Sequence, residues 1–382
     1  MNREPSSFAA RLRGLMAQHE LLPGEHSLQQ QFDSLALELF AIQFKANPAY
    51  GKICAARQLT PATVRHWAQI PFVPTGAFKE LELSCIAPGN RTAVFHSSGT
   101  TEQKPSRHFH SAESLALYEV SLWRWFKARF SVENEFVFLT PDQPAAPHSS
   151  LVYMFETVRK NARTERAEFF GGVAAGGAWT INFDSVVHKL RRTCDDGKPL
   201  TILGTAFSFV HLLDFMADNS LQFNLPGGSL VMETGGYKNR SRTMPKSELH
   251  ALITEHLGVP GDNITCEYGM SELSSQAYDS ILDRRGPPQL EAGLKQAGAR
   301  PGTPISRHFR FPPWANVQII SPENGHEVAE GETGLIRIFD LANVFSVAAI
   351  QTEDLGIRHG HGFDLVGRIQ LAEARGCSLM TA

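Results

Sequence analysis

A loop at positions 96–106 carries the residue types that bind phosphate groups. The apolar run Ala93-Val94-Phe95 predicts a strand, and the polar loop follows directly after it. Its small hydroxyl residues and its glycine are Ser97, Ser98, Gly99, Thr100 and Thr101. Backbone N–H groups and hydroxyls in such a loop can donate hydrogen bonds to phosphate oxygens, and Lys104 adds a positive charge. The spacing differs from that of a Walker A loop, and a loop rich in serine and threonine also occurs as a plain surface turn.

The loop and three later segments resemble, in the same order, the signature motifs of the adenylate-forming superfamily, whose members activate carboxylates as acyl-adenylates. The loop resembles the superfamily's run Ser/Thr-Ser-Gly-Thr-Thr-Gly-Lys-Pro, with Glu102-Gln103 where one glycine is usual. The later segments are Tyr268-Gly269-Met270-Ser271-Glu272, Thr352-Glu353-Asp354-Leu355-Gly356 and Gly367-Arg368. Alone, each is explained equally well by a solvated acid, a turn or a surface cation. Four in a fixed order over about 270 residues form a specific pattern.

The resemblance implies a role for each segment. Tyr268 would stack on the adenine ring, Glu272 would help to hold Mg²⁺, and Asp354 would accept hydrogen bonds from the ribose hydroxyls. The implied ATP-binding residues are Ser97, Ser98, Gly99, Thr100, Thr101, Gly235, Gly236, Tyr268, Gly269, Met270, Ser271, Asp354 and Arg368. We therefore expect ATP and Mg²⁺ as cofactors.

The chemistry of adenylation agrees with this set of residues. A carboxylate must attack the α-phosphate while pyrophosphate leaves, so the protein has to hold two anions together and neutralise the growing charge. A phosphate loop, a metal-binding carboxylate and a ribose-binding carboxylate meet these needs. Lys104 and Arg368 are the candidate catalytic cations.

Within the superfamily, the sequence resembles the acyl-protein synthetases of the bacterial luminescence fatty-acid reductase system over nearly its whole length. The shared features include Ile70–Lys79, Thr234–Lys238 and Ala374–Leu379. The sequence ends 14 residues after Arg368, so we expect a short tail in place of the usual C-terminal domain, which carries a catalytic lysine.

The resemblance implies that Cys377 takes the acyl group as a thioester and passes it to a reductase or another acceptor protein. A thiolate is a strong nucleophile and a good leaving group, which suits such a transfer. An inert cysteine in a loosely held terminus is the alternative. Three other functions stay open: an acyl- or aryl-CoA ligase, a stand-alone adenylating enzyme of a biosynthetic pathway, and a nucleotide-binding module without turnover.

A small set of residues could shape the acyl pocket. Gly204 and Phe207 would supply a small residue and an aromatic wall, and His211 could point into the same space. A core phenylalanine and a structural helix histidine explain these residues equally well.

Composition excludes several classes of protein. The chain has 382 residues, 42% hydrophobic and 20% charged, with a net charge of −3, which is typical of a globular protein and gives no basic surface for nucleic acid. No run of about 18 apolar residues predicts a membrane span. The five cysteines fit neither a disulfide framework nor a zinc motif, so we expect reduced thiols and a cytoplasmic location.

The expected elements alternate between strands and helices from about residue 136. Strands are predicted at 136–140, 200–205, 229–233 and 263–268, and helices at 185–192, 209–218 and 247–257. This order predicts parallel β/α layers, with ligands at the carboxyl ends of the strands, including the strand before Ser97.

The rest of the chain has a different character at each end. The first 70 residues are predicted to be mainly helical (8–19, 28–45 and a helix over 62–67 capped by Thr60), and shorter alternating strands are predicted after Phe309. This pattern agrees with the fold that the resemblance implies, which is the α/β fold of the large domain of acyl-adenylate synthetases. Its parts would be α/β layers at 1–300, a smaller mostly β subdomain at 301–368 and a tail at 369–382.

Overall fold

The computed structural model describes residues 3–18, 27–97, 104–162, 164, 166–235, 244–279 and 307–368. Several candidate residues lie outside these ranges, namely Ser98, Gly99, Thr100, Thr101, Gly236 and Cys377. The expected boundary near residue 300 and the expected tail lie outside them as well. Within the described segments, no helix has both the length and the apolar character needed to cross a bilayer.

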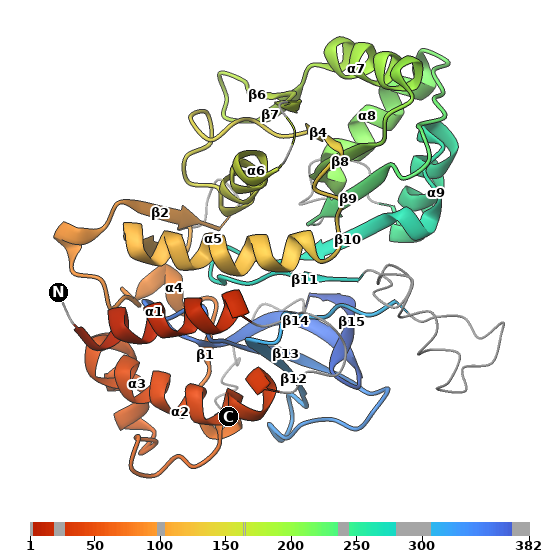
Figure 1. The fold of residues 1–382 in the computed structure, drawn as a ribbon. Coiled ribbons are helices and arrows are strands. Elements are labelled where there is room, and N and C mark those ends of the chain that lie inside the picture. The colour runs from red at the N-terminus through yellow and green to blue at the C-terminus, as the bar shows by residue number, and fades with distance from the viewer. Residues whose placement is uncertain are drawn as a thin grey trace, which may run out of the picture.

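A six-stranded sheet forms the upper half of the molecule in Figure 1. Its strands, in spatial order, are β11 (Ala277–Tyr278), β10 (Ile264–Tyr268), β9 (Leu230–Thr234), β8 (Leu200–Thr205), β4 (Glu135–Phe138) and β5 (Ala167–Phe169). All neighbouring pairs are parallel except β10 and β11. The predicted parallel β/α layers are therefore confirmed.

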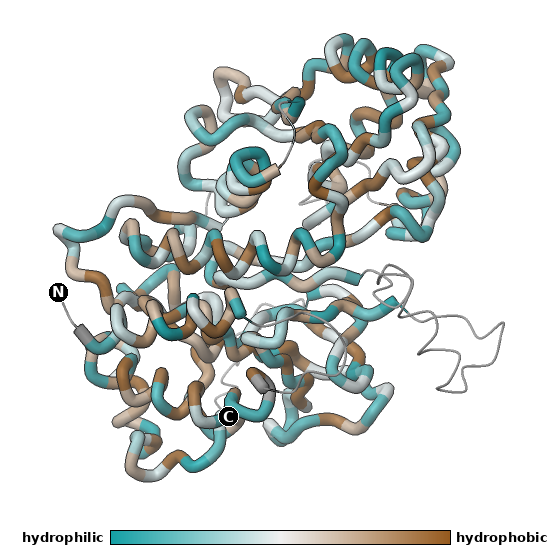
Figure 2. Tube along the Cα trace, in the orientation of Figure 1, coloured by the Kyte–Doolittle hydropathy of each residue, from teal (hydrophilic) through white to brown (hydrophobic). Residues whose placement is uncertain are grey.

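Both faces of this sheet are covered by helices, because alternate residues of its strands point to opposite sides. Val137, Ile202 and Val231 face one apolar cluster, which includes α7 (Phe183–Asp196), α8 (Ala206–Asp218) and α9 (Lys246–Leu257). Phe138, Leu203 and Met232 face a second cluster, which includes α5 (Ala112–Lys127) and α6 (Ser150–Asn161). Along α5, hydrophobic and hydrophilic residues alternate in Figure 2, as expected for a helix with one buried side.

Side-chain caps fix where the helices begin beside the sheet. The Thr205 side chain, at the end of β8, accepts a hydrogen bond from the Ser208 N–H and so starts α8. The Asn182 side chain accepts a hydrogen bond from the Ser185 N–H and so starts α7. After α7, Gly197 adopts the left-handed conformation, with φ 66°, which ends the helix. These caps turn the chain sharply at the carboxyl ends of the strands.

A five-stranded sheet lies in the lower half of Figure 1. Its strands are β1 (Val73–Pro74), β14 (Ala349–His359), β13 (Thr333–Asp340) and β12 (Ala315–Ile320), with β15 (Gly362–Arg368) paired to β14. Three of its four strand pairings are antiparallel, and β1 from the N-terminal region pairs in parallel with β14. Beside this sheet lie α1 (Arg3–Gln18), α2 (Ser27–Ala46) and α3 (Pro48–Ala56).

The remaining elements are short. They are two antiparallel hairpins, β2 (Ala93–His96) with β3 (Arg107–His110) and β6 (Gly171–Val173) with β7 (Trp179–Ile181), the helix α4 (Ala77–Glu80), and three 3₁₀ turns, η1 (Trp67–Gln69), η2 (Pro88–Asn90) and η3 (Gly261–Asn263). The predicted helix over 62–67 is wrong. The Thr63 hydroxyl accepts from the Thr60 N–H and donates to the Thr60 carbonyl, which closes a local turn instead of continuing a helix.

Gln43 of α2 holds the N-terminal helices against the loop between β13 and β14. Its buried side-chain amide donates to the carbonyls of Asn343 and Val344 at 2.7 and 3.2 Å. Its side-chain oxygen accepts from the Ala348 N–H at 3.1 Å. One side chain thus satisfies three backbone groups about 300 residues away in the sequence.

We expect Gln43→Ala to lower the free energy of unfolding by about 1–3 kcal/mol, because it leaves buried backbone groups without partners. Urea denaturation measures the change. Gln30→Ala, at an exposed position of the same helix, is the matched control and should have little effect. Equal effects of the two substitutions would contradict the role given to Gln43.

Candidate active site

The carboxyl ends of three parallel strands meet at one edge of the large sheet. The register places Thr205 of β8 beside Thr234 of β9, and Thr234 beside Glu267 of β10. Gly235 follows with φ 74°, a left-handed conformation that favours glycine. The sequence prediction that these strand ends lie together is confirmed.

Asp354 joins the two sheets through its carboxylate. Its Oδ2 accepts a hydrogen bond from the Tyr268 hydroxyl at 2.9 Å, and its Oδ1 accepts from Nε of Arg368 at 2.8 Å. Arg368 lies directly opposite Asp354 in the pairing of β14 with β15. Three predicted site residues from three separate motifs are therefore in contact.

Tyr268 is held firmly in this arrangement. Its ring makes edge contacts with Phe309, Phe311 and Phe363, at centroid distances of 6.0, 6.3 and 5.3 Å. Burial, with the neighbouring Asp354 charge, raises the pKa of Tyr268 well above its ordinary value. The phenol therefore stays protonated and donates to Asp354.

A chain of serine hydroxyls connects the phosphate loop with the segment after β10. Ser97 and Ser106, on either side of the loop, exchange backbone-to-side-chain hydrogen bonds at 3.0 and 3.3 Å. The Ser106 hydroxyl lies 3.4 Å from the Ser271 hydroxyl, and Ser271 donates to Oε2 of Glu272 at 3.0 Å. The two motifs are thus linked, although about 170 residues separate them.

The sequence interpretation placed the strand before Ser97 in the parallel sheet, and this is wrong. β2 forms a separate antiparallel hairpin with β3, because residues 107–110 fold back against residues 93–96. His108 of β3 fixes this hairpin to the site through a 2.8 Å hydrogen bond between its Nδ1 and the Ser271 carbonyl. Burial lowers the pKa of His108 to about 4, so the imidazole is neutral at physiological pH.

Glu272 fits the metal role that the sequence implies. Its side chain is buried, and no lysine or arginine of the described segments forms an ion pair with it. Mg²⁺ is commonly held by one or two carboxylates, with phosphate oxygens and water as its other ligands. A buried carboxylate that pairs with no described lysine or arginine, and that is linked through Ser271 to Ser106 at the base of the phosphate loop, suits this mode of binding.

The other candidates lie in different settings. Lys104 forms an exposed ion pair with Glu80 at 3.3 Å. Gly204 is buried in β8, where a β-carbon would lie 3.0 Å from Cβ of Leu139, so its small size serves strand packing. The rings of Phe207 and His211 make an edge-to-face contact on α8, with centroids 4.3 Å apart, and both side chains are half-buried.

Gly269 and Met270 connect β10 to the polar segment. A β-carbon at Gly269 would collide with the Glu267 carboxylate, so a side chain here would displace that acid from its present position. Gly269 is exposed and Met270 is half-buried, which leaves the turn accessible from solvent.

Glu267 is a buried acid at the site that the sequence interpretation did not single out. It accepts a hydrogen bond from the Thr234 hydroxyl, which follows from their pairing across β9 and β10. Burial, and to a lesser degree the neighbouring Glu233 charge, raises the pKa of Glu267 to about 7, against the lowering effect of Thr234. The signal in the sequence is an acid within the apolar strand at 264–268.

Comparison with known proteins gives one family. Residues 20–285 match the family model for the acyl-protein synthetase LuxE. A long-chain-fatty-acid–luciferin-component ligase of Aliivibrio fischeri is 23% identical over 378 residues, which cover 94% of this chain and 91% of the relative.

Solved structures with the same fold include 2-hydroxyisobutyryl-CoA ligase in two states. The open conformation, in complex with 2-HIB-AMP and CoA, has a TM-score of 0.62 and 13% identity, covering 92% of this chain and 81% of that chain. The thioesterification state has a TM-score of 0.63 and 13% identity, covering 91% and 68%. The α/β fold expected from the sequence is therefore confirmed.

We expect the pH dependence of stability to change in Glu267→Gln. The pKa of Glu267 is about 7 in the folded protein, against an ordinary value of 4.5. Between pH 4.5 and about 7, the folded protein therefore binds the Glu267 proton more tightly than the unfolded chain does. Glu267 therefore lowers stability as the pH rises through this window, whereas a neutral amide does not. Urea denaturation from pH 4.5 to 8 should show the variant gaining up to about 3 kcal/mol relative to the wild type.

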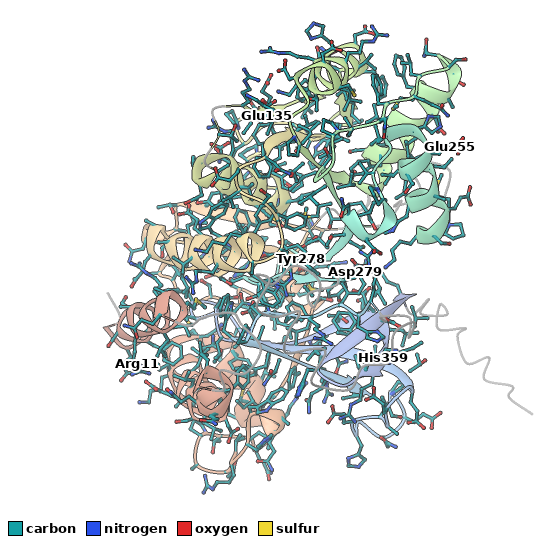
Figure 3. The ribbon with its side chains drawn as sticks, turned by 45° about the vertical axis from the view of Figure 1, so that its right-hand side comes forward. Arg11, Glu135, Glu255, Tyr278, Asp279 and His359 are labelled. Carbon is teal, nitrogen blue, oxygen red and sulfur yellow. The ribbon has the colours of Figure 1, made fainter. Side chains whose placement is uncertain are left out.

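The exposed Glu255→Gln is the control for this measurement; Figure 3 shows Glu255 on the outer side of the molecule, at helix α9. Its free energy of unfolding should differ from that of the wild type by the same amount at every pH. If the difference in free energy of unfolding between Glu267→Gln and the wild type also does not change with pH, the raised pKa of Glu267 is contradicted.

Proposed function

The chain belongs to the acyl-protein synthetase (LuxE) family and is an ATP-dependent ligase that adenylates carboxylic acids; on this premise we propose that its substrate is a fatty acid and its acyl acceptor is Cys377. The fatty acid is suggested by the name of the Aliivibrio relative. The observation that carries the site assignment is the contact of Asp354 with both Tyr268 and Arg368.

In the proposed site, ATP lies across the serine-linked loop with its ribose at Asp354. The triphosphate would be bound by Ser97, Ser98, Gly99, Thr100 and Thr101, and the base would lie near Gly235, Gly236, Tyr268, Gly269, Met270 and Ser271. Support comes from the hydrogen bonds that join Ser97, Ser106, Ser271 and Glu272. Mg²⁺ at Glu272 would neutralise charge on the phosphates.

Lys104 and Arg368 are the proposed catalytic cations. An exposed ion pair such as Lys104 with Glu80 contributes little to stability, so Lys104 can exchange this partner for a phosphate. Arg368 already lies at Asp354, close to where the ribose and the α-phosphate would lie. Gly204, Phe207 and His211 stay the proposed acyl pocket, on the same edge of the sheet as Thr205.

The second step transfers the acyl group to Cys377. The thiolate sulfur attacks the acyl carbonyl carbon, a carbon–sulfur bond forms, and the bond to the AMP phosphate oxygen breaks, so AMP leaves and the thiol proton passes to solvent. Cys377 follows Arg368 by 377 − 368 = 9 residues. A stretch of this length spans at most about 30 Å, which allows the sulfur to reach a nucleotide held at Asp354. The thioester would then pass to a reductase or another acceptor protein.

A reducing cytoplasmic setting suits this chemistry. In the described segments, Cys54, Cys85, Cys194 and Cys266 are all free thiols. A cysteine that must act as a nucleophile also has to stay reduced.

The acceptor is tested with ATP, Mg²⁺ and a radiolabelled fatty acid. We expect the wild type to carry a hydroxylamine-sensitive label and Cys377→Ala to lose it while pyrophosphate release continues. Cys194→Ala, at another free and partly exposed thiol, is the control and should keep the label. A label retained in Cys377→Ala refutes the acceptor assignment.

Other outcomes of this assay identify the alternatives. Pyrophosphate release without any protein label indicates a stand-alone adenylating enzyme, and a CoA-dependent product indicates a CoA ligase. The absence of pyrophosphate release in the wild type over a range of fatty and aromatic acids contradicts adenylation itself.

The nucleotide site is tested with Asp354→Asn. Loss of the carboxylate removes charge-assisted hydrogen bonds worth about 1.5–3 kcal/mol, so the KM for ATP in pyrophosphate release should rise about 10–100-fold. Glu323→Gln, an exposed substitution in a turn of the same sheet, is the control. An unchanged KM for ATP, with the fold intact by circular dichroism, would remove Asp354 from the site.

A further inference from the structure

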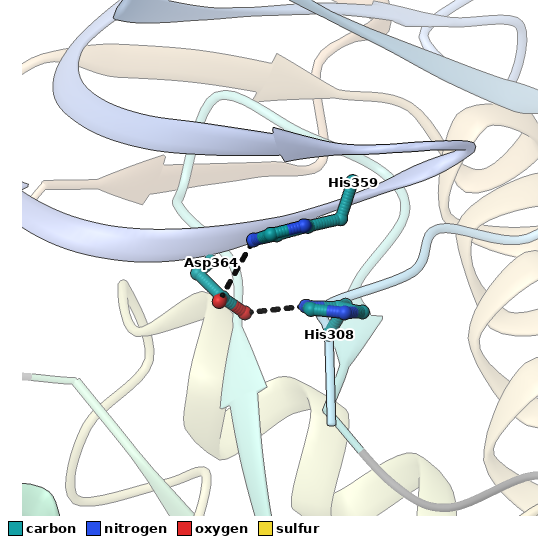
Figure 4. Close-up of side chains that lie close together, drawn as sticks. All are labelled: His308, His359 and Asp364. Atoms are coloured by element: carbon teal, nitrogen blue, oxygen red, sulfur yellow. Dashed lines mark hydrogen bonds and ion pairs between the residues drawn. The ribbon is translucent and has the colours of Figure 1, made fainter. Parts of the chain in front are cut away.

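Two histidines and an aspartate converge beside the five-stranded sheet, outside the site described above. Nδ1 of His308 lies 2.7 Å from Oδ1 of Asp364, and Nε2 of His359 lies 3.1 Å from Oδ2. The two imidazole rings are stacked, with centroids 3.9 Å apart and planes inclined by 21°. Figure 4 shows both rings directed toward the one carboxylate.

The three side chains come from separate backbone segments. His359 ends β14, Asp364 lies in β15, and His308 precedes Phe309, which pairs with Phe363 through an isolated bridge. The ligand atoms all lie within 4.8 Å of one another. Among the described residues, no other group of three histidine, cysteine or acidic side chains meets this condition.

We propose that His308, His359 and Asp364 bind a divalent transition-metal ion of the zinc class. Zinc binds nitrogen and oxygen ligands at about 2.0–2.2 Å, so tetrahedral ligand atoms lie about 3.3 Å apart. The two N–O separations of 2.7 and 3.1 Å are close to this value. The stacked rings would have to tilt toward each other so that a nitrogen of each points at the ion. Two nitrogens and one carboxylate favour zinc, cobalt or nickel over magnesium and calcium, which prefer all-oxygen sites.

A second carboxylate orients one of the ligands. Nδ1 of His359, the nitrogen turned away from Asp364, lies 3.8 Å from Oε1 of Glu330. Both carboxylate oxygens of Glu330 accept from the Gly360 N–H at 2.9 Å, which fixes this side chain beside the imidazole. A histidine held between a metal and a carboxylate is a recurrent feature of zinc sites.

The site has a place for further ligands. The side chains of His308, His359 and Asp364 are 13%, 27% and 41% exposed, so water can complete a tetrahedral shell. Such an ion would tie the end of β14, the middle of β15 and residue 308 together. Phe309 and Phe363, which adjoin these ligands, pack against Tyr268, so the ion would also stabilise the support of the nucleotide site.

The proposal is tested by calorimetric titration of chelator-treated, full-length protein with Zn²⁺ in excess Mg²⁺. We expect the wild type to bind one Zn²⁺ that Asp364→Asn and His359→Gln do not bind. His361→Gln is the matched control, since it removes an exposed histidine two residues from His359, and it should bind as the wild type does. Circular dichroism verifies that each variant is folded.

Two further measurements distinguish this site from cysteine sites and from a nonspecific effect. Co²⁺ should give visible bands of tetrahedral cobalt without a thiolate charge-transfer band, and Glu330→Gln should weaken Zn²⁺ binding about 10–100-fold. Hydrogen exchange of residues 362–368 should slow on Zn²⁺ addition to the wild type but not to Asp364→Asn.

Three results would overturn the proposal: no Zn²⁺-dependent heat in the wild type, equal binding by the wild type and Asp364→Asn, or a thiolate band with Co²⁺. None of these measurements depends on adenylation, so the failure of this site and the failure of the proposed function are distinguishable.

Discussion

The polar segment at 271–276 is the constraint on which the rest of the site depends. All six residues are buried, although five of them, all except Leu273, are polar. Buried polar groups are costly unless they are hydrogen-bonded, so this segment has to be matched by partners on every side. On one side, the hairpin of β2 and β3 supplies Ser106 and His108.

The other side of the segment is matched by the end of β13. Asp340 accepts from the Ser274 N–H and the Ser275 hydroxyl at 2.9 and 2.8 Å, and Asn343 donates to the Glu272 carbonyl at 2.7 Å. Burial raises the pKa of Asp340 to about 6, against these hydrogen bonds, which favour its charged form. The same contacts that satisfy the segment therefore place the two sheets and the hairpin of β2 and β3 relative to one another. Figure 3 shows the neighbouring residues Tyr278 and Asp279 at this junction between the two halves.

The sequence predicts the elements of the large sheet well, and its limits have physical causes. The strand at 200–205 and the carboxyl-end positions of Thr205, Thr234 and Tyr268 follow from local apolar runs and turns, which the chain itself encodes. The pairing of β1 with β14 depends on a partner far away in the sequence, so no local pattern reveals it. The hairpin of β2 has a partner nearby, at 107–110, but the polar residues of that segment give no strand signal. The convergence of His308 with Asp364 also depends on a distant partner, because it requires the bridge between Phe309 and Phe363.

The geometry of Asp354 shows how one carboxylate can support the fold and still bind a ligand. A carboxylate has about four acceptor positions, two on each oxygen. Tyr268 uses one on Oδ2 and Arg368 uses one on Oδ1, so both oxygens keep an acceptor position. Ribose hydroxyls could therefore bind without displacing either donor, and the strand that carries Arg368 would keep its place during binding. Because β15 is also fixed at Asp364 and Phe363, both of its ends are held, and Arg368, its last residue, has a defined place beside Asp354. The proposed nucleophile, Cys377, is nine positions from Arg368 in the sequence, so the length of the chain limits its distance from a nucleotide bound at Asp354 and would raise its effective concentration there.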